Sequence, residues 1–222
     1  MIGFRRTGGF RPPEFAELLE VADDGTFRMW RSVSMAAPLP SPIGRFAGRL
    51  PAPQLGSLSD AAKRAAAQGS RTWLVSPDSP VDRFEVDGAS ATLGIHDPGE
   101  GAWEAFASLV RPLLGELTAS PLAAIALDVT AGPALLHQGS EPLALDLSHL
   151  TVRIVHWRDG QSEGRWTAPE TDAGEVAAGQ GWRLRLPFEH GFALEAGDRL
   201  TVQATFAAFD GERLVPVSLQ TA

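Results

Sequence analysis

The chain has 222 residues, of which 44% are hydrophobic and 21% charged, and its formal net charge is −8. This composition excludes a largely disordered chain, and the length accommodates one large β-rich domain or two small ones. The acidic balance excludes a general nucleic-acid binder, because neutralising phosphates requires a basic surface.

The sequence lacks cysteine, a secretory signal and a membrane-spanning run, and these absences restrict the possible reactions and cellular location. The chain has no cysteine, which excludes disulfides, thiolate zinc sites and cysteine nucleophiles. The opening MIGFRRTGGF is interrupted by charge and glycine, unlike a secretory signal. No run approaches the ~18 apolar residues that span a bilayer. We therefore expect a soluble, cytoplasmic bacterial protein that binds neither membrane nor nucleic acid.

The first predicted elements are strands. Residues 2–11 read as a short strand that is broken or turned at Gly8 and Gly9. Residues 15–33 read as a hairpin whose left arm is a strand or a helical turn, with Asp24-Gly25 supplying the tight turn. The segment 35–44 is rich in proline, which cannot occupy an inner strand, and is interpreted as an exposed loop.

A helix and further strands follow. Residues 45–53 are compatible with a short strand. The alanine-rich run after it predicts a short helix with Ser57 or Ser59 as N-cap and Gly69 as the C-terminal signal. Residues 83–96 read as two short arms around a second Asp-Gly turn.

Residues 101–117 carry apolar side chains at helical spacing, and Pro112 is expected to kink or split that helix. The first 118 residues thus contain the order strand, Asp-Gly, strand, helix twice. A sheet with two helices on one face buries such a pattern. We predict an α+β domain over residues 1–118.

A domain boundary is expected near TASP (118–121), where the charge also shifts. Residues 1–118 carry 12 Lys/Arg against 14 Asp/Glu, whereas residues 119–222 carry 7 against 13. Beyond the boundary the apolar residues alternate with period two, as in the run Leu143, Leu145 and Leu147 and in the next run, Leu150, Val152 and Ile154. Turn signals occur between the predicted strands. About six or seven short strands without a helix indicate an immunoglobulin-like β-sandwich over residues 119–222. Without a disulfide, Trp157, Trp166 or Trp182 is expected to fill its centre.

The glycines of GGF at 8–10 do not form a phosphate loop. They lack the Lys-Ser/Thr of the P-loop and the spacing of the dinucleotide fingerprint, and two prolines follow at once. Arg5, Arg6 and Arg11 are open to two interpretations, a small anion-binding patch or a solvated edge with salt links to acidic residues.

Catalytic and metal motifs are missing from the sequence. The histidines show none of the usual ligand spacings, and neither G-x-S-x-G nor S-x-x-K occurs. We therefore predict no enzymatic activity, no cofactor and no metal site. The alternative, an enzyme with a dispersed site, would need a polar pocket that holds a histidine with a carboxylate partner. The five histidines are His96, His137, His149, His156 and His190.

The first half of the chain resembles the emfourin-like family. The resemblance is carried by RRTGGF, a long first hairpin, a helix with L-x-x-L…A-A, the segment D-x-F-x-V-D-G and a closing helix with L-V-x-x-L-L. It spans residues 1 to about 118, while the insertion at 35–44 and the second half depart from the pattern. The matching residues are Arg6, Thr7, Gly8, Gly9, Phe10, Leu55, Leu58, Ala61, Ala62, Asp82, Phe84, Val86, Asp87, Gly88, Leu109, Val110, Leu113 and Leu114.

This resemblance implies a function. Members of the family are small bacterial proteins that inhibit thermolysin-type metalloproteases such as protealysin, so it implies a non-enzymatic inhibitor or regulator with a protease as its protein partner. It also implies that Gly8, Gly9 and Phe10 form a partner-binding loop, which Arg11 and Pro12 brace.

The second half more faintly resembles the immunoglobulin-like domain of bacterial intracellular proteinase inhibitors. An alternative function is an interaction or assembly module of a multiprotein bacterial system without inhibitory activity, which the extra domain favours. The oligomeric state stays open.

Overall fold

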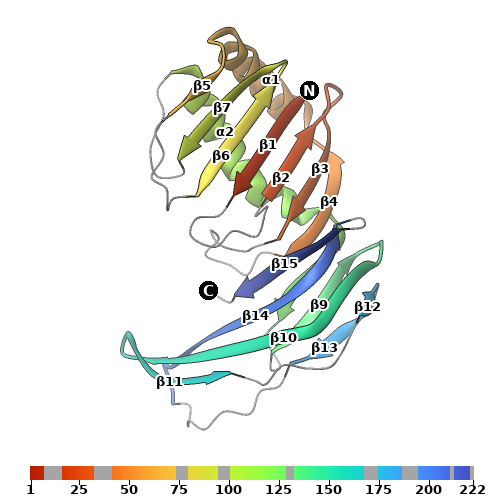
Figure 1. Cartoon of the computed structure of the whole chain (residues 1–222), viewed down its shortest axis with the longest axis vertical. Helices are drawn as coiled ribbons and strands as arrows, with labels where there is room; N and C mark the ends of the chain where they lie inside the picture. The colour runs from red at the N-terminus through yellow and green to blue at the C-terminus, as the bar shows by residue number, and fades with distance from the viewer. Residues whose placement is uncertain are drawn as a thin grey trace. The chain divides into compact units, whose positions relative to one another are not determined.

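The computed structural model describes residues 1–7, 17–32, 42–73, 80–94, 101–128, 133–167, 175–186, 195–210 and 213–220. The chain divides into two compact units. Unit 1 consists of Met1–Arg31 and Arg45–Ser120, and unit 2 of Ser32–Gly44 and Pro121–Ala222. Strands predominate among the described residues, together with two α-helices (Figure 1). Neither of these helices has the length and apolar character needed to cross a membrane.

Unit 1 is built on a mixed sheet in the order β4-β3-β2-β1-β6-β7-β5. The pairs β1–β2, β2–β3, β1–β6 and β6–β7 are antiparallel, whereas the short β5 runs parallel to β7. The first two residues of β4 belong to unit 2 and the remainder to unit 1. The strands are β1 (Ile2–Thr7), β2 (Glu17–Val21), β3 (Thr26–Arg31), β4 (Ile43–Arg49), β5 (Arg71–Thr72), β6 (Val81–Val86) and β7 (Ala89–Gly94).

Both predicted Asp-Gly hairpins are confirmed, and they use different turns. Asp87 and Gly88 both have positive φ, 47° and 84°, the combination that a two-residue type I′ turn requires. The connection between β2 and β3 is longer, and in it only Gly25 has positive φ, at 84°. The left arm of this first hairpin is a strand, which settles the alternative that the sequence left open.

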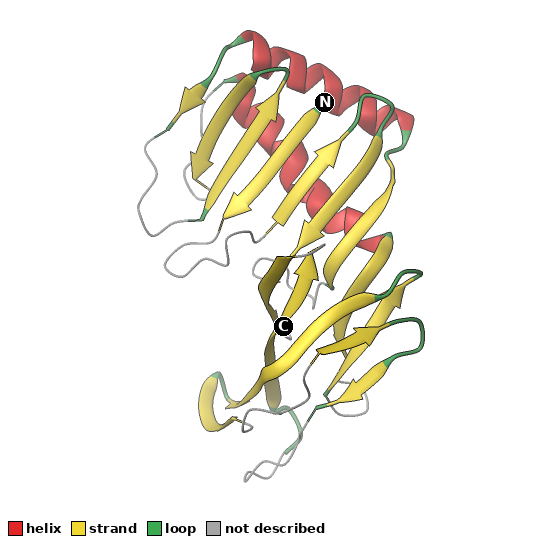
Figure 2. Cartoon of the chain, turned by 45° about the vertical axis from the view of Figure 1, so that its right-hand side comes forward, coloured by secondary structure: helices red, strands yellow, loops and turns green. Residues whose placement is uncertain are grey.

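Two helices, α1 (Ala52–Ala67) and α2 (Ala102–Glu116), lie on the same side of this sheet (Figure 2). A short 3-10 turn, η1 (Leu117–Ala119), follows α2. Each helix buries residues at helical spacing, as Leu58, Ala61, Ala62 and Ala65 do in α1. Between α2 and the sheet the aromatic rings make contact, with ring centroids 5.2 Å apart for Phe4–Phe84 and 5.6 Å for Phe84–Phe106.

The predicted start of α1 is wrong. The helix begins at Ala52, so Ser57 and Ser59 lie inside it, and Pro51 occupies the N-cap position without a side-chain hydrogen bond. Proline suits a helix start because its missing N–H would have no partner there in any case. The predicted end is confirmed, since Gly69 follows the helix at φ 78° and donates its N–H to the carbonyl of Ala66 at 2.9 Å.

The predicted split of the second helix does not occur. The helix runs continuously from Ala102 to Glu116 with Pro112 inside it. Trp103, Phe106, Val110, Leu113 and Leu114 are all buried. Packing of this apolar face against the sheet outweighs the hydrogen bond that proline removes.

Unit 2 contains two sets of antiparallel strands. One set is β13-β9-β8, which belongs to the same ten-stranded sheet as β4, and the other is the separate sheet β11-β10-β14-β15, with β12 also paired to β10. The strands are β8 (Pro121–Asp128), β9 (Ala134–Gly139), β10 (Leu143–Arg158), β11 (Gln161–Thr167), β12 (Glu175–Ala178), β13 (Arg183–Arg185), β14 (Arg199–Asp210) and β15 (Arg213–Gln220). The sequence analysis did not predict β9, β11 or β12.

The two runs predicted around residues 143–147 and 150–154 form one strand, β10, with an irregularity between them. Asp146 pairs with Ala207, but the next recorded pair is Thr151 with Thr205, so β10 contains extra residues at this point. The carboxylate of Asp146 accepts hydrogen bonds from the backbone N–H and the hydroxyl of Ser148, at 2.9 and 2.6 Å, which fixes the irregularity.

Most of the described buried side chains of unit 2 are aliphatic, among them the predicted Leu143, Leu145 and Ile154, and they are joined by Phe206. Trp157 and Trp182 are only partly buried, so neither fills the centre as expected, and the side chain of Trp166 lies outside the description.

Glycine is required where two backbones of unit 2 approach closely. A Cβ on Gly44, whose φ is 126°, would lie 2.3 Å from the carbonyl oxygen of Ala123. A Cβ on Gly139, at φ 104°, would lie 2.4 Å from that of Leu122.

Candidate functional site

The predicted partner-binding residues Gly8, Gly9, Phe10, Arg11 and Pro12 lie outside the described residues. The described residues on either side of this segment are Thr7 and Glu17, and both belong to unit 1. Because β1 and β2 are antiparallel, both flanks lie at the same end of the sheet (Figure 1). We call this the connecting end of unit 1.

A row of alternating charges crosses four neighbouring strands at the connecting end. The strand register sets Asp82 opposite Arg6, Arg6 opposite Glu17, and Glu17 opposite Arg31. Directly paired residues project from the same face of a sheet. This is the face of Phe4, two positions before Arg6, and therefore the one that packs on the helices. We refer to these four residues as the charge row.

Short hydrogen bonds join the members of the charge row. The guanidinium of Arg6 donates from Nε to Asp82 Oδ1 at 2.7 Å, from Nη2 to Asp82 Oδ2 at 3.1 Å and from Nη1 to Glu17 Oε2 at 2.8 Å. Arg31 donates from Nε to Glu17 Oε1 at 2.7 Å. Each inner member of the row is thus shared by the two residues beside it, and the fork of Arg6 holds Asp82 in bidentate geometry.

The helix α2 covers the row and extends it. Arg111 donates from Nε to Asp82 Oδ2 at 3.0 Å, and from Nη1 to Glu104 at 3.1 Å. Arg31 reaches the same helix, where it donates to the carbonyl of Leu114 at 3.1 Å. Arg111 and Glu104 together with the charge row form what we call the charge network, which contains three guanidinium groups and three carboxylates.

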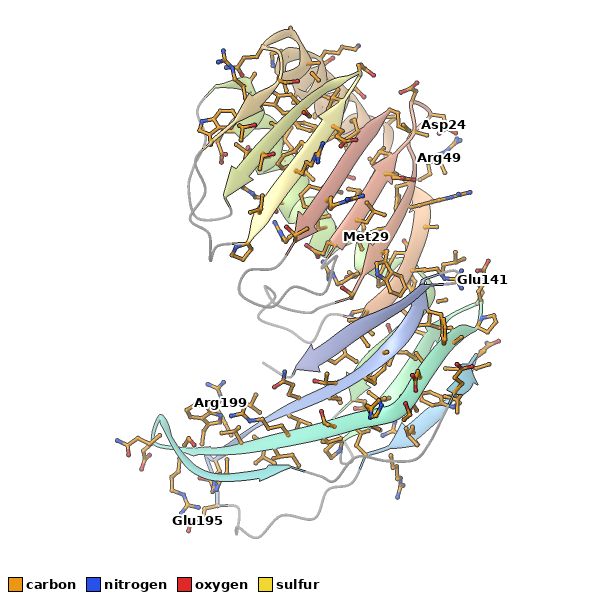
Figure 3. The ribbon with its side chains drawn as sticks, in the orientation of Figure 1. Asp24, Met29, Arg49, Glu141, Glu195 and Arg199 are labelled. Carbon is orange, nitrogen blue, oxygen red and sulfur yellow. The ribbon has the colours of Figure 1, made fainter. Side chains whose placement is uncertain are left out.

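The charge network is buried and electrically balanced. The side chain of Asp82 is 0% exposed and that of Arg6 12%, whereas Glu104 at the outer end is 25% exposed. Burial lowers the pKa of the Arg6 guanidinium. The hydrogen bonds and charges of Asp82 and Glu17 outweigh this effect and raise that pKa above its ordinary value. A solvated ion pair of similar length joins Arg49 to Asp24, at 2.7 Å with side-chain exposures of 68% and 57% (Figure 3).

Four connecting segments have an end in the charge network. Arg6 and Glu17 bracket residues 8–16, Arg31 lies just before residues 33–41, and Asp82 follows residues 74–79. Arg111 contributes the fourth link, because it donates to the carbonyl of Gly94 at 3.2 Å, immediately before residues 95–100. The network therefore fixes the points at which these four segments leave or rejoin the sheet.

The two interpretations of the N-terminal arginines are now partly resolved. Arg6 makes salt links to acidic residues, as one of them proposed, but it does so in the core and not on a solvated edge. Arg5 is exposed on the opposite face of β1, and Arg11 lies outside the described residues.

A histidine–carboxylate pair occurs in unit 2. His156 Nε2 lies 2.8 Å from Asp198 Oδ2, and the histidine is only 1% exposed. Hydrogen bonds from Arg158, followed by the backbone N–H of Glu195, hold the pKa of Asp198 well below its usual range, although burial opposes them. Because Asp198 already accepts from this arginine and from the backbone of its own turn, the pair fastens that turn to β10.

The other described histidines do not suggest a reacting group. His137 is buried with Nε2 2.9 Å from the carbonyl of Glu141, and His149 is exposed on β10. His96 and His190 lie outside the description. Within the described part of the chain, no three histidine, aspartate or glutamate side chains gather in a way that would hold a metal ion.

The charge network is suited to positioning rather than to proton transfer. Each of its carboxylates accepts hydrogen bonds from at least one guanidinium, so none is set up as a general base or a metal ligand. What the arrangement does is hold four strands and one helix in fixed register at the connecting end. In the comparisons with known proteins, no family model, no curated protein and no solved structure matches the chain.

Proposed function

We propose that this protein is a non-enzymatic, protein-binding inhibitor or regulator of a bacterial thermolysin-type metalloprotease. In this proposal residues 8–12 contact the protease. The observation that carries it is the anchoring of residues 8–16 at both ends, where Arg6 Nη1 donates to Glu17 Oε2 at 2.8 Å inside the buried charge row. The emfourin-like resemblance of the first half supplies the class of partner.

Anchoring at both ends is what an inhibitory segment needs. A chain whose ends are fixed loses less conformational freedom on binding than a free one, so more of the contact energy remains as affinity. Breaking the anchor would be costly, since both flanking residues belong to a buried network in which a lost partner leaves a charge uncompensated. In this arrangement Phe10 is the apolar contact, and Arg11 and Pro12 stiffen the chain beside it.

We further propose that residues 1–118 are an emfourin-like α+β domain and residues 119–222 an immunoglobulin-like β-sandwich. The two helices on one face of the unit 1 sheet support the first assignment. The second is supported by the two sets of antiparallel strands in unit 2 and by their buried apolar residues. In this proposal the sandwich adds a second surface for a protein partner.

The test is a titration of the purified full chain against a thermolysin-type metalloprotease with a fluorogenic peptide substrate. We expect stoichiometric loss of protease activity. Replacing Phe10→Ala should raise the inhibition constant by about 30-fold or more, the loss of about 2 kcal/mol typical of an anchor side chain. Arg11→Ala should have a smaller effect, and Arg64→Ala, an exposed arginine of α1, serves as the control of the same residue type.

Two outcomes would contradict the proposal. Full protease activity at a large excess of the protein would rule out inhibition. Equal inhibition by wild type and Phe10→Ala would remove residues 8–12 from the contact. If the protein bound a protease or another partner without affecting catalysis, the alternative function, an interaction or assembly module, would replace the inhibitor.

A further inference from the structure

We infer that the charge network couples the strand ends at the connecting end of unit 1, so that a displacement of one strand end is transmitted to the others. This inference goes beyond the proposed function and does not depend on it, because it concerns only the groups within unit 1. Its consequence is that a partner that displaces one strand end would also displace the neighbouring ones.

The first argument is that the network has shared members. Asp82 Oδ2 accepts from both Arg6 Nη2, at 3.1 Å, and Arg111 Nε, at 3.0 Å. Glu17 divides its two oxygens between Arg6, at 2.8 Å, and Arg31, at 2.7 Å. No inner member can move without changing the geometry of two bonds. Guanidinium groups are planar and rigid, so a rotation that follows one partner misaligns the other.

The second argument is that α2 closes the chain of bonds into a ring. Arg111 of α2 binds one end of the charge row, and the carbonyl of Leu114, one helical turn further along, binds Arg31 at the other end. A shift of this turn of α2 therefore pulls on both ends of the row at once. The same arginine also holds the carbonyl of Gly94, at 3.2 Å, so the end of β7 is tied to the same turn of α2.

The third argument is burial. The side chains of Asp82, Arg6 and Glu17 are 0%, 12% and 7% exposed, so water replaces a lost partner poorly. A buried charge that loses its partner is strongly unfavourable, so the remaining members must rearrange to compensate. A solvated ion pair would relax locally instead, which is why the coupling requires a buried network.

Hydrogen exchange of the full chain, followed by mass spectrometry, tests the coupling without any partner. We compare wild type with Arg111→Gln and Glu104→Gln, which alter only the α2 side of the network. The readout is exchange in residues 2–7 and 17–21, on β1 and β2. We expect it to accelerate about threefold or more in Arg111→Gln, and in the same direction but less in Glu104→Gln. The control is Arg83→Gln, which is on β6 beside Asp82, is 57% exposed and pairs with Glu85.

Several outcomes would overturn the inference. Acceleration confined to residues 94–116 would show that the perturbation stops at α2. Equal acceleration in Arg83→Gln, or uniform acceleration across all of unit 1 in both network variants, would show a general loss of stability instead of coupling. If Arg111→Gln fails to fold, the comparison of Glu104→Gln with the control decides.

A double-mutant cycle gives an independent measurement. Glu104→Gln and Arg31→Lys lie at the two ends of the network. Glu104 accepts from Arg111, whereas Arg31 donates to Glu17 and to the carbonyl of Leu114. If the two sites are coupled, the unfolding equilibrium constant of the double variant should differ by about threefold or more from the product of the two single-variant effects. Independent sites should give that product. Additive effects would overturn the inference.

Discussion

Replacing Arg6 by methionine should destabilise the protein far more than the same replacement at Arg49. Both arginines make an ion pair at 2.7 Å, with Asp82 and Asp24 respectively. The pairs differ in burial, since side-chain exposures are 12% and 0% for the first and 68% and 57% for the second. Methionine keeps most of the apolar stem in each case, so the comparison isolates the charged group.

The expected magnitudes follow from that difference in burial. Removing one partner of a buried ion pair costs about 3–5 kcal/mol, because the other charge is left uncompensated. Arg6→Met leaves both Asp82 and Glu17 with one fewer guanidinium. Removing one partner of an exposed pair costs about 0–1 kcal/mol, since water solvates the charge that remains. We therefore expect a difference of at least about 2 kcal/mol in the free energy of unfolding.

Urea denaturation measures both values. Among the described residues the α-helices belong to unit 1, so the far-ultraviolet helix signal follows the unit that carries the substitutions. A lower urea concentration at the midpoint, with an unchanged dependence of the unfolding free energy on urea, shows that the protein has lost stability. If Arg6→Met and Arg49→Met cost the same within about 1 kcal/mol, the charge row does not stabilise unit 1 as a buried network. The arguments for anchoring and coupling would then fail with it.

Three further substitutions probe other parts of the fold. Gly139→Ala should cost more than about 2 kcal/mol by urea denaturation, because its Cβ would meet a carbonyl oxygen at 2.4 Å. Gly160→Ala is the control with no atom within 4 Å of the added Cβ, and an equal cost would refute the steric reason. The lowered pKa of Asp198 means that its carboxylate stabilises the fold above its unfolded pKa of about 3.9 and loses this effect as the pH falls towards its lower folded value. Asp198→Asn should therefore make the decline of stability below about pH 4 shallower, and an unchanged pH profile would contradict this. Trp103→Phe removes a 2.9 Å hydrogen bond to the Gly69 carbonyl and should lower the free energy of unfolding of unit 1 by about 1 kcal/mol, seen as a lower melting temperature; an unaltered melting temperature would show that the bond contributes nothing.

The sequence was most informative where structure is determined by neighbouring residues. The Asp-Gly hairpins were predictable because only a few residue types tolerate positive φ, as at Asp87 and Gly88. Most of the buried face of α2 was predictable from apolar spacing, although Leu109, which belongs to the same predicted set, is 39% exposed. The start of α1 was missed because Ser57 and Ser59 are typical N-cap residues. The helix instead begins after Pro51, and a second proline lies in its first turn.

Predictions failed where distant parts of the chain decide the structure. The strand β9 was missed because Ala134 and Leu135 are both buried, which breaks the period-two pattern. The two runs of β10 were separated in the prediction because the apolar residues change phase between Leu147 and Leu150. Only the pairing of β10 with β14 on both sides of this phase change joins them into one strand.

The charge row has a signature in the sequence, namely charged residues at positions where each strand otherwise has buried apolar ones. Arg6, Glu17, Arg31 and Asp82 each occupy the apolar phase of their strand, two positions from a buried Phe, Leu or Met. A charged residue in that phase must find a partner in the core. Which partner it finds depends on the register between strands, and no local pattern specifies the pairing of Arg6 with Asp82, 76 positions away.

That long separation has a consequence for the order of assembly. Arg6 and Glu17 are only 11 positions apart, and Glu17 and Arg31 only 14, so β1, β2 and β3 can associate early. This early meander carries two cations of the row and one carboxylate. We expect pulse-labelled hydrogen exchange to show protection in β1–β3 before the β1–β6 ladder, and earlier protection in β6 would contradict this order. Asp82, which neutralises the excess cation, arrives with the strand that completes the sheet around β1.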